Sequence, residues 1–325
     1  MHNKLKKACS FLNRTADDYK FYRRFSGYYA YLRVCSRLSD RAGMKHLSST
    51  FWKKRHAWVT EYLAHTLQPV LDQFADDQNP GSYQENAPIW VCWWTGEDSA
   101  PPLVTKCIHS IRKNAGSHPV HLITKDNYRQ YLDIPAHILN KVNDKTMCLA
   151  NFSDYIRFSL LAQYGGLWLD ATIYCAAPIP ESIFRMPVFS CKGGNRSVQY
   201  ISDYRWTSFC YGGFKGNILF RYMQTAFDAY WCQTDIAVDY LLVDYLINLG
   251  YSHIDQIRLH MDQIPENNLR RDDLQAAMNA ALPADQFDSI LDPDTVLYKL
   301  SWRESYSLQT PQGSDSVYAY FLNHN

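Results

Sequence analysis

The chain has 325 residues, 46% hydrophobic and 20% charged, so its composition excludes a disordered protein and allows one large α/β domain with an appendage. No apolar run approaches about 18 residues, which excludes a membrane-spanning helix. Nine dispersed cysteines without a C-x-x-C pair argue against a disulfide scaffold and against cysteine zinc ligands, and they favour a reducing cytosol.

The N-terminal segment is strongly basic. Residues 1–55 hold 14 Lys and Arg against three acids, a net charge of +11, whereas the rest of the chain carries −10. Aromatic residues lie between these charges, so the segment suits an anionic membrane surface, nucleic acid or the acidic body of its own chain. A solvated helical face packed on the domain explains the pattern equally well. Nucleic acid is the weakest interpretation, because no recognised motif accompanies the charge.

We expect three parts along the chain. Residues 1–76 have helical apolar spacing, 77–88 cluster Pro, Gly, Asn and Asp as a linker does, and 89–325 form the main domain. The first elements expected in this domain are a strand at 89–94, a helix at 100–114, a strand at 119–124 and a short helix at 128–132. Strand, helix, strand, helix within about 40 residues predicts a parallel sheet.

The next elements contain the residues that suggest chemistry. We expect helices at 135–142 and 147–163, the second ended by Gly165-Gly166, and then a strand at 167–172. The later expected elements are strands near 187–191 and 207–214, helices at 216–231 and 236–249, a mostly helical 253–290, a strand at 295–300 and a loop at 301–316.

Two acids and one arginine are expected to converge. Asp154 and Arg157 are three residues apart on one helix and share a face, and Asp170 ends the strand that follows. Because ligands of open parallel sheets bind beyond the carboxyl ends of strands, these side chains would lie at the ligand edge. There they suit hydrogen bonds to sugar hydroxyls or to a diphosphate. The alternative without a function is a plain ion pair between Asp154 and Arg157.

The stretch FSDYIRFSLLAQYGGLWLDAT, residues 152–172, resembles the core of the capsular polysaccharide synthesis glycosyltransferases. It is also similar to the wider group of DxD-type sugar transferases that includes the yeast mannosyltransferases and the clostridial toxin glucosyltransferases. The shared pattern is S-D-x-x-R, an apolar helix, Y-G-G and a strand ending in D-x-D. IWVCWWTGEDSAPPLVTKCIHSI and LYKLSWR resemble the family's first strand and helix and its C-terminal Lys-Leu-x-Trp segment, so the resemblance covers about residues 88–303.

This resemblance implies a GT-A-like (Rossmann-like) nucleotide-sugar-binding sandwich, here with a helical N-terminal extension. It implies that Trp94 stacks on the base of the donor. It assigns Asp154, Arg157 and Asp170 to the donor sugar and to catalysis. Three further residues would lie on the diphosphate side of the donor: Lys299, Ser301 and Trp302.

The resemblance also implies a divalent metal, Mn²⁺ or Mg²⁺, held at Asp170 and Thr172. In the toxin-like members the last D-x-D position is an acid that binds the metal, whereas here it is Thr172. A neutral hydroxyl is a poorer ligand for a hard cation than a carboxylate. The acids that we consider for the missing oxygen are Asp203, Asp239, Asp244, Glu304 and Asp315.

The resemblance implies an enzyme that transfers a hexose from a nucleoside-diphosphate sugar to a saccharide acceptor. The acceptor would be linked to a lipid and would belong to surface or capsular polysaccharide synthesis. The resemblance also implies retention at the anomeric carbon. We expect the protein in the cytoplasm, peripheral at the inner face of the plasma membrane. One alternative, motivated by Thr172, is a nucleotide-sugar-binding module of the same fold with weak or no activity. Another is a related transferase that acts on a protein or moves a sugar phosphate.

Overall fold

A five-stranded sheet forms the centre of the protein, whose computed structural model describes residues 2–194, 196–282 and 284–323. In the order β2-β1-β3-β6-β5, the strands span Val120–Ile123, Ile89–Cys92, Gly166–Leu169, Cys210–Gly213 and Val188–Ser190. β1 pairs parallel with β2 and with β3, whereas β6 pairs antiparallel with β3 and with β5. The predicted parallel arrangement is confirmed for the first three strands, and the other two form an antiparallel edge.

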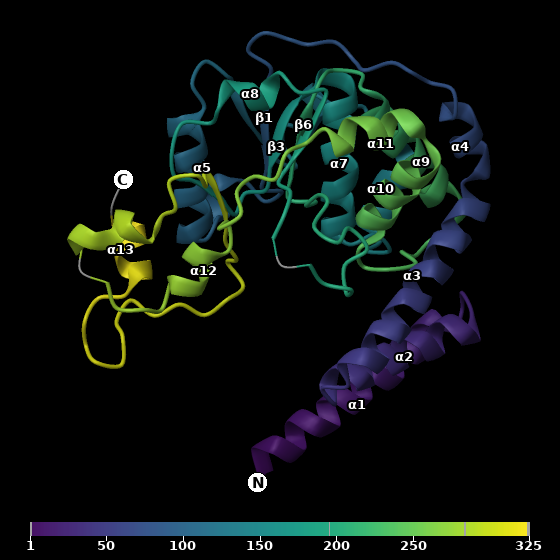
Figure 1. Cartoon of the computed structure of the whole chain (residues 1–325), viewed down its shortest axis with the longest axis horizontal. Helices are drawn as coiled ribbons and strands as arrows, with labels where there is room; N and C mark the ends of the chain where they lie inside the picture. The colour runs from purple at the N-terminus through teal and green to yellow at the C-terminus, as the bar shows by residue number, and fades with distance from the viewer. Residues whose placement is uncertain (1, 195, 283, 324–325) are drawn as a thin grey trace.

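Helices cover both faces of this sheet, with α5 (Pro102–Asn114) on one side and α7 (Leu149–Tyr164) on the other (Figure 1). Successive side chains of a strand point to opposite faces. Leu167 and Leu169 therefore join the buried cluster of α5, and Trp168 joins that of α7. The predicted α/β sandwich is confirmed, and each face of the sheet has its own apolar core.

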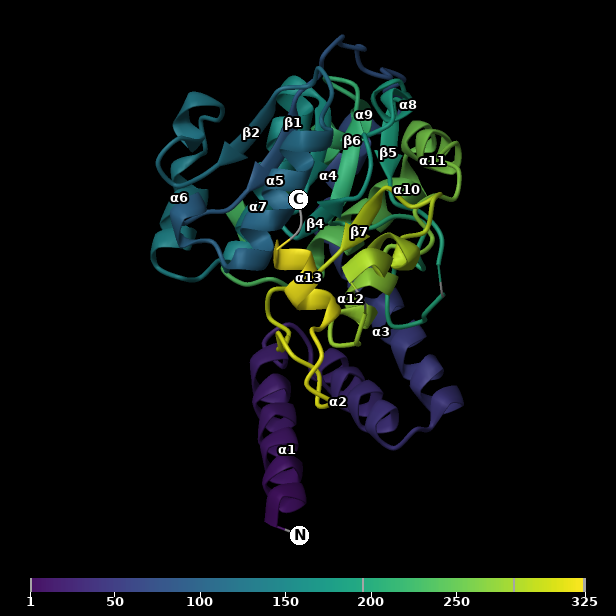
Figure 2. The ribbon, with the colours of Figure 1, turned by 90° about the vertical axis from the view of Figure 1, so that its left-hand side faces the viewer.

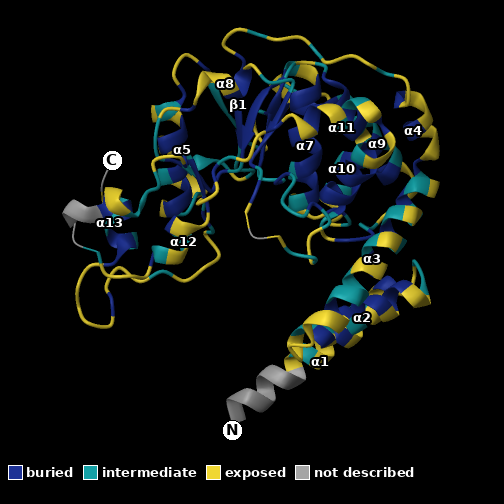
Figure 3. Cartoon of the chain, viewed as in Figure 1, coloured by how far each residue is buried: buried dark blue, intermediate teal, exposed yellow. Residues whose placement is uncertain are grey.

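The larger core lies on the α7 side. Here α7 packs against α9 (Ile218–Gln233) and α10 (Leu242–His253), and α10 packs against α11 (Asp255–Asp262). Figure 3 shows α7 buried along most of its length, as its apolar sequence requires for a helix between a sheet and other helices. Polar residues of α7 are consequently held rigidly by the helices and the sheet around them.

The glycine pair that follows α7 is required by close backbone contacts. Gly165 ends the helix at φ 68°, and its N–H donates to the Leu161 carbonyl. Gly166 opens β3 at φ 93°, and a Cβ atom there would lie 2.0 Å from the Pro88 carbonyl oxygen. Only glycine fits this crossing of the chain. The Tyr-Gly-Gly motif therefore sets how β3, and Asp170 beyond it, approaches the sheet.

A second, two-stranded ribbon continues from β3. β4 (Ile173–Cys175) pairs antiparallel with β7 (Leu297–Lys299), with Ile173 opposite Lys299. The single strand predicted at 167–172 is therefore wrong. The chain leaves the main sheet after Leu169 and turns at Asp170, whose carbonyl accepts a hydrogen bond from the Ile173 amide. The side chain of Asp170 accepts hydrogen bonds from groups beyond the end of β3, which holds this turn in place.

Four helices precede the sheet: α1 (His2–Tyr22), α2 (Gly27–Arg41), α3 (Lys45–Thr66) and α4 (Gln68–Phe74). They confirm the helical character predicted for this segment, and α1, α2 and much of α3 project from the body of the protein (Figures 1 and 2). α3 packs against α10, so the extension joins the main core. Within the described residues, no helix has the length and apolarity needed to cross a bilayer.

The remaining elements are short. They comprise α6 (Ala136–Asn143), α8 (Glu181–Phe184), α12 (Asp273–Ala277), α13 (Val317–Asn323) and three 3₁₀ helices, Glu97–Ser99, Tyr128–Gln130 and Ala284–Ile290. The prediction that 253–290 is mostly helical is only partly confirmed, since an irregular stretch separates α11 from α12. Residues 301–316 form the expected loop, and α13 after it was missed because it is only seven residues long.

Candidate functional site

A cavity of about 630 Å³ opens at the carboxyl ends of β1 and β3, the edge where open α/β sheets bind ligands. β1 ends at Cys92, two residues before the predicted strand end, so Trp93 and Trp94 leave the sheet and line the cavity. α7 forms a second wall, and residues 299–303 form a third. The volume lies in the range of small-molecule sites, roughly 300–1,000 Å³.

Asp170 lies on the wall of this cavity and accepts hydrogen bonds on both carboxylate oxygens. Arg157 Nη2 and Trp168 Nε1 each donate to Oδ1 at 3.0 Å, and Lys299 Nζ donates to Oδ2 at 2.9 Å. Burial alone would raise the pKa of Asp170, but Lys299 and Arg157 hold it below its usual value. Asp170 is therefore a fixed, ionised carboxylate.

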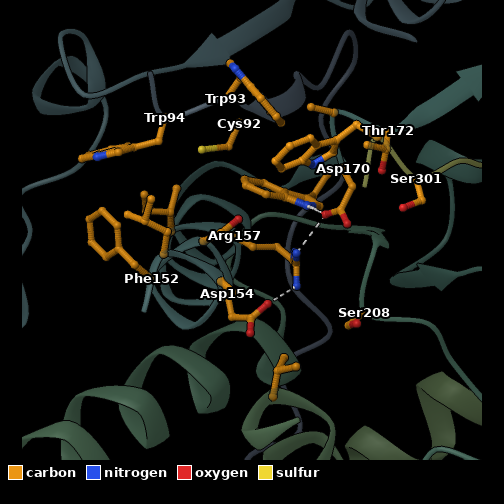
Figure 4. Close-up of a pocket in the computed structure, with 18 of the residues that line it drawn as sticks. Cys92, Trp93, Trp94, Phe152, Asp154, Arg157, Asp170, Thr172, Ser208 and Ser301 are labelled. Carbon is orange, nitrogen blue, oxygen red and sulfur yellow. Dashed lines mark hydrogen bonds and ion pairs between the residues drawn. The ribbon is translucent and has the colours of Figure 1, made fainter. Parts of the chain in front are cut away.

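Arg157 joins Asp170 to Asp154. Its Nη1 donates to Asp154 Oδ1 at 2.6 Å, and Figure 4 shows the guanidinium between the two acids. The side chain of Arg157 is only 4% exposed, so this bridge is held rigidly inside the protein. Burial raises the pKa of Asp154 to about 7, against the effect of Arg157 and with further contributions from Asp170 and Asp244. The cavity thus has one acid that is ionised and one that titrates near neutral pH.

The β4–β7 ribbon brings C-terminal residues to the same place. Lys299 Nζ donates to Thr172 Oγ1 at 2.8 Å as well as to Asp170, and Ser301 and Trp302 follow it along the cavity wall. Trp302 is 44% exposed and packs edge-on against Trp93 with ring centres 5.8 Å apart. The structure therefore brings together residues that are far apart in the sequence, such as Asp170 and Lys299, which are separated by 129 positions.

Trp94 lies at the opposite end of the cavity from Thr172 and Ser301 in Figure 4. Its ring meets Phe152 edge-on at 4.9 Å and lies 5.3 Å from the ring of Tyr128. These contacts fix the plane of a large aromatic surface at the cavity wall. All eight residues that the sequence analysis assigned to the site line this cavity, whereas their individual roles stay predictions.

Comparison with known proteins identifies the family. The sequence model described as "Capsular polysaccharide synthesis protein" matches residues 41–321. The chain belongs to this family. Among solved structures, a chain titled "PaToxG Glycosyltransferase" is similar at 12% identity, over 66% of this chain and 91% of that chain, with a TM-score of 0.37. None of the curated proteins matches.

The residues around Asp170 do not match the ligand set of the metal predicted for this member of the family. Mn²⁺ and Mg²⁺ prefer several carboxylate, carbonyl or water oxygens. Both Asp170 oxygens and Thr172 Oγ1 already accept hydrogen bonds, and two of the donors are the cationic groups of Arg157 and Lys299. Among the residues that the structure describes, no group of three His, Cys, Asp or Glu could hold a metal. The pair Asp170 and Thr172 therefore lacks further protein ligands here.

The acids considered for the missing ligand lie elsewhere. All of them are described by the structure and do not line the cavity: Asp203, Asp239, Asp244, Glu304 and Asp315. Asp239 precedes α10, where it binds Arg33 and Arg55, so its expected place on the same helix as Asp244 is wrong. Asp244 is buried and accepts from Trp206 Nε1 at 2.9 Å. Both acids have structural partners instead.

Sequence reasoning missed Trp168, Trp93 and Arg303 as cavity residues of this family member. Trp168 holds Asp170 through its indole N–H, and the guanidinium carbon of Arg157 lies 5.0 Å from its ring centre. A signal for Trp168 was present, because residues two apart in a strand share a face and Trp168 is two before Asp170. Trp93 and Arg303 carry no such signal, since both lie in irregular segments beyond strand ends.

Proposed function

We propose that this protein is a glycosyltransferase that transfers a hexose from a nucleoside-diphosphate sugar to a saccharide acceptor. The observation that carries the proposal is the buried Arg157 bridge between Asp154 and Asp170 on the wall of a cavity at the carboxyl ends of parallel strands. The match to the capsular polysaccharide synthesis family over residues 41–321 supports it. The cavity wall presents acids, cations and aromatic rings together. These groups suit the sugar, the diphosphate and the base of a nucleotide sugar.

Each kind of group has a role in the proposed transfer. A carboxylate has about four acceptor positions, and Asp154 uses one of them for Arg157, so it can accept hydrogen bonds from sugar hydroxyls. Lys299 and Arg157 place positive charge where a diphosphate leaving group gains negative charge. Trp94 offers its ring to the base of the donor. Ser301 and Trp302 close the diphosphate side.

The acceptor belongs to the same proposal. Family membership supports a saccharide of a surface or capsular polysaccharide as the acceptor. We infer from the resemblance that this acceptor is carried on a lipid and that the configuration at the anomeric carbon is retained. Exposed basic and aromatic side chains on α1 to α3 support attachment to an anionic membrane surface, at its cytoplasmic side. Peripheral attachment would bring the cavity to an acceptor held in the bilayer.

A panel of nucleotide sugars tests the proposal. UDP-, GDP-, CDP- and ADP-sugars are incubated with the full chain in Mn²⁺, in Mg²⁺ and in EDTA. Binding is measured by calorimetry, and cleavage is measured as release of nucleoside diphosphate. We expect one nucleotide class to be bound and cleaved. Binding without cleavage under every condition would favour the binding-module alternative that Thr172 suggests. Failure of the whole panel to bind would contradict the proposal.

A further inference from the structure

Lys299 occupies a position that a metal ligand set would need free. Its ammonium group bonds Asp170 Oδ2 at 2.9 Å and Thr172 Oγ1 at 2.8 Å, the first and third residues of the D-x-D-like sequence. An acid at position 172 would give a metal a second charged oxygen, whereas the threonine hydroxyl gives a hydrogen-bond acceptor suited to an ammonium. The positive charge at this motif is supplied by the chain itself.

The backbone fixes Lys299 in this place. In the β4–β7 ribbon Lys299 lies opposite Ile173, the neighbour of Thr172, and the amide of Leu300 donates to the Thr172 carbonyl at 2.9 Å. The Lys299 amide donates to the Arg271 carbonyl at 2.8 Å. The lysine is therefore set by strand register rather than by a flexible loop.

Lys299 is also able to bind a ligand. An ammonium group has three donors, and Asp170 and Thr172 take two of them. The side chain lines the cavity and is 26% exposed. Three cations line the cavity, Arg157, Lys299 and Arg303, against the two acids Asp154 and Asp170. The wall therefore keeps one positive charge more than it has acids, so an anionic oxygen can bind there without a further cation.

We propose that the Lys299 ammonium takes the place of the divalent cation, so that this chain binds a nucleoside diphosphate and cleaves the donor without a metal. The inference rests on the proposed function and names its leaving-group stabiliser. The bond between the sugar C1 and the β-phosphate oxygen breaks, and its electron pair stays on that oxygen beside Lys299. The acceptor hydroxyl oxygen bonds to C1, and its proton goes to the departing phosphate.

The test is calorimetry of UDP, GDP, CDP and ADP with the full chain, in EDTA and then in Mn²⁺ or Mg²⁺. At least one nucleotide should bind in EDTA with a Kd within about threefold of the value in Mn²⁺. Lys299→Met should weaken this binding in EDTA by at least about tenfold, the order expected for one charge-assisted hydrogen bond. Lys299→Arg should restore most of it. The control Lys113→Met, at an exposed residue of α5 outside the cavity, should leave Kd unchanged.

A double variant sharpens the result. Thr172→Asp with Lys299→Met removes the ammonium and restores the acid, so its nucleotide binding should depend on Mn²⁺. If the unaltered chain binds a nucleotide only with metal, or if Lys299→Met binds as well as the unaltered chain in EDTA, the inference is overturned while the proposed function stands. If the chain binds none of the nucleotides under any condition, the proposed function fails together with it. Melting temperatures of all variants show whether each is folded.

Discussion

Asp170 accepts its three hydrogen bonds from different elements: Arg157 from α7, Trp168 from β3 and Lys299 from β7. Two of these donors are charged, so the ionised carboxylate is favoured although it lies at a largely buried strand end. The same carboxylate orients Arg157 and Lys299 at the cavity wall. Asp170 therefore holds two cations in place at the cavity wall, in addition to the sugar contact that we propose for it.

Trp94 gives a direct test of base stacking. If its ring stacks on the base, Trp94→Ala should weaken nucleotide binding by about 1–3 kcal/mol, the usual worth of such stacking. Calorimetry with the nucleoside diphosphate that binds measures the change. Trp52→Ala is the control, because Trp52 lies on α3 away from the cavity. An unchanged Kd for Trp94→Ala would mean that Trp94 serves only to pack on Phe152 and Tyr128.

Asp154 predicts a pH effect on stability. Its pKa in the folded protein is raised by burial to about 7, from an ordinary value of 3.8, so between these values the folded state binds more protons than the unfolded state. The contribution of Asp154 to the free energy of unfolding must then fall as pH rises through this window, by up to about 1.4 kcal/mol per pH unit. Urea unfolding is measured at several pH values between 5 and 8. The free energy of unfolding of Asp154→Asn should increase relative to that of the unaltered chain as pH rises. Parallel pH curves would contradict the raised pKa.

The residue scale also shows what the sequence could and could not predict. Helical spacing and the strand end were sufficient to bring Asp154, Arg157 and Asp170 together. The bond from Lys299 to Thr172 could not be foreseen, because it depends on the register of a ribbon between distant segments. That register also leaves the metal expectation without the ligands it needs.

The N-terminal helices are tied to the main core by a buried ionic cluster, which is the main feature at the element scale. Asp239 accepts from Arg33 at 2.8 Å and from Tyr29 at 3.0 Å, and it also binds Arg55. Two cations of the basic segment are therefore internal partners, as the interpretation of contact with the acidic body of its own chain predicted for part of the charge. Deletion of residues 1–55 would remove all three of these partners of Asp239, so it would damage the fold as well as any membrane contact.

Asp239→Ala should destabilise the protein by about 3–5 kcal/mol, because loss of one partner leaves buried charges uncompensated. The matched control is Asp235→Ala, four residues earlier, whose 81%-exposed side chain pairs with Lys141 at the surface. That change should cost at most about 1 kcal/mol. Urea denaturation of both variants measures the difference. Equal effects would show that the Asp239 cluster does not hold the helices to the core.

The membrane attachment that we propose depends on these helices. Of the sixteen large apolar side chains that are exposed among the described residues, eight lie between Leu12 and Leu47. Arg23 and Arg24 are exposed beside them, so Arg23→Ala with Arg24→Ala should weaken binding to vesicles of anionic lipid by about 2 kcal/mol, roughly thirtyfold. Flotation or tryptophan fluorescence with titrated vesicles reports the change.

The control for the vesicle experiment alters two equally exposed cations outside the extension, Arg196→Ala with Arg270→Ala. Added salt should weaken binding of the unaltered chain, since exposed charges are screened beyond about 8–10 Å. If both double variants bind alike, the extension does not direct attachment. Binding that salt does not affect would contradict an electrostatic surface.

Element types were more predictable than element ends. Long periodic segments such as α5 and α7 were predicted almost in full, because each buries a continuous apolar face. The end of β3 was misjudged, since an apolar run on both sides of Asp170 reads as one strand although it enters two sheets. A turn between sheets is a tertiary feature, and local sequence carries little trace of it.

At the scale of the whole molecule, the apolar cores, the cavity and the basic helices lie in separate regions of the fold. The two apolar cores flank the sheet, the cavity opens where the sheet meets the β4–β7 ribbon, and the basic helices project away from the body (Figures 1 and 2). The ribbon links the D-x-D-like turn to the C-terminal segment, which explains why the resemblance includes the segment LYKLSWR as well as residues 152–172. The charge asymmetry could be predicted from the sequence. The cavity could not, because its walls come from segments that meet only in the folded chain.

The central claim is that the cavity around Asp170 transfers sugar from a nucleotide donor, and Asp170→Asn tests it most directly. The measurement is the initial rate of nucleoside diphosphate release from the donor that the panel identifies, taken together with the melting temperature. We expect a rate at least about 100-fold lower, the order lost with one preorganised electrostatic group, and a variant that still melts cooperatively. Asp235→Asn, at the exposed surface, should retain full activity. Release that persists in a folded Asp170→Asn protein would contradict the account.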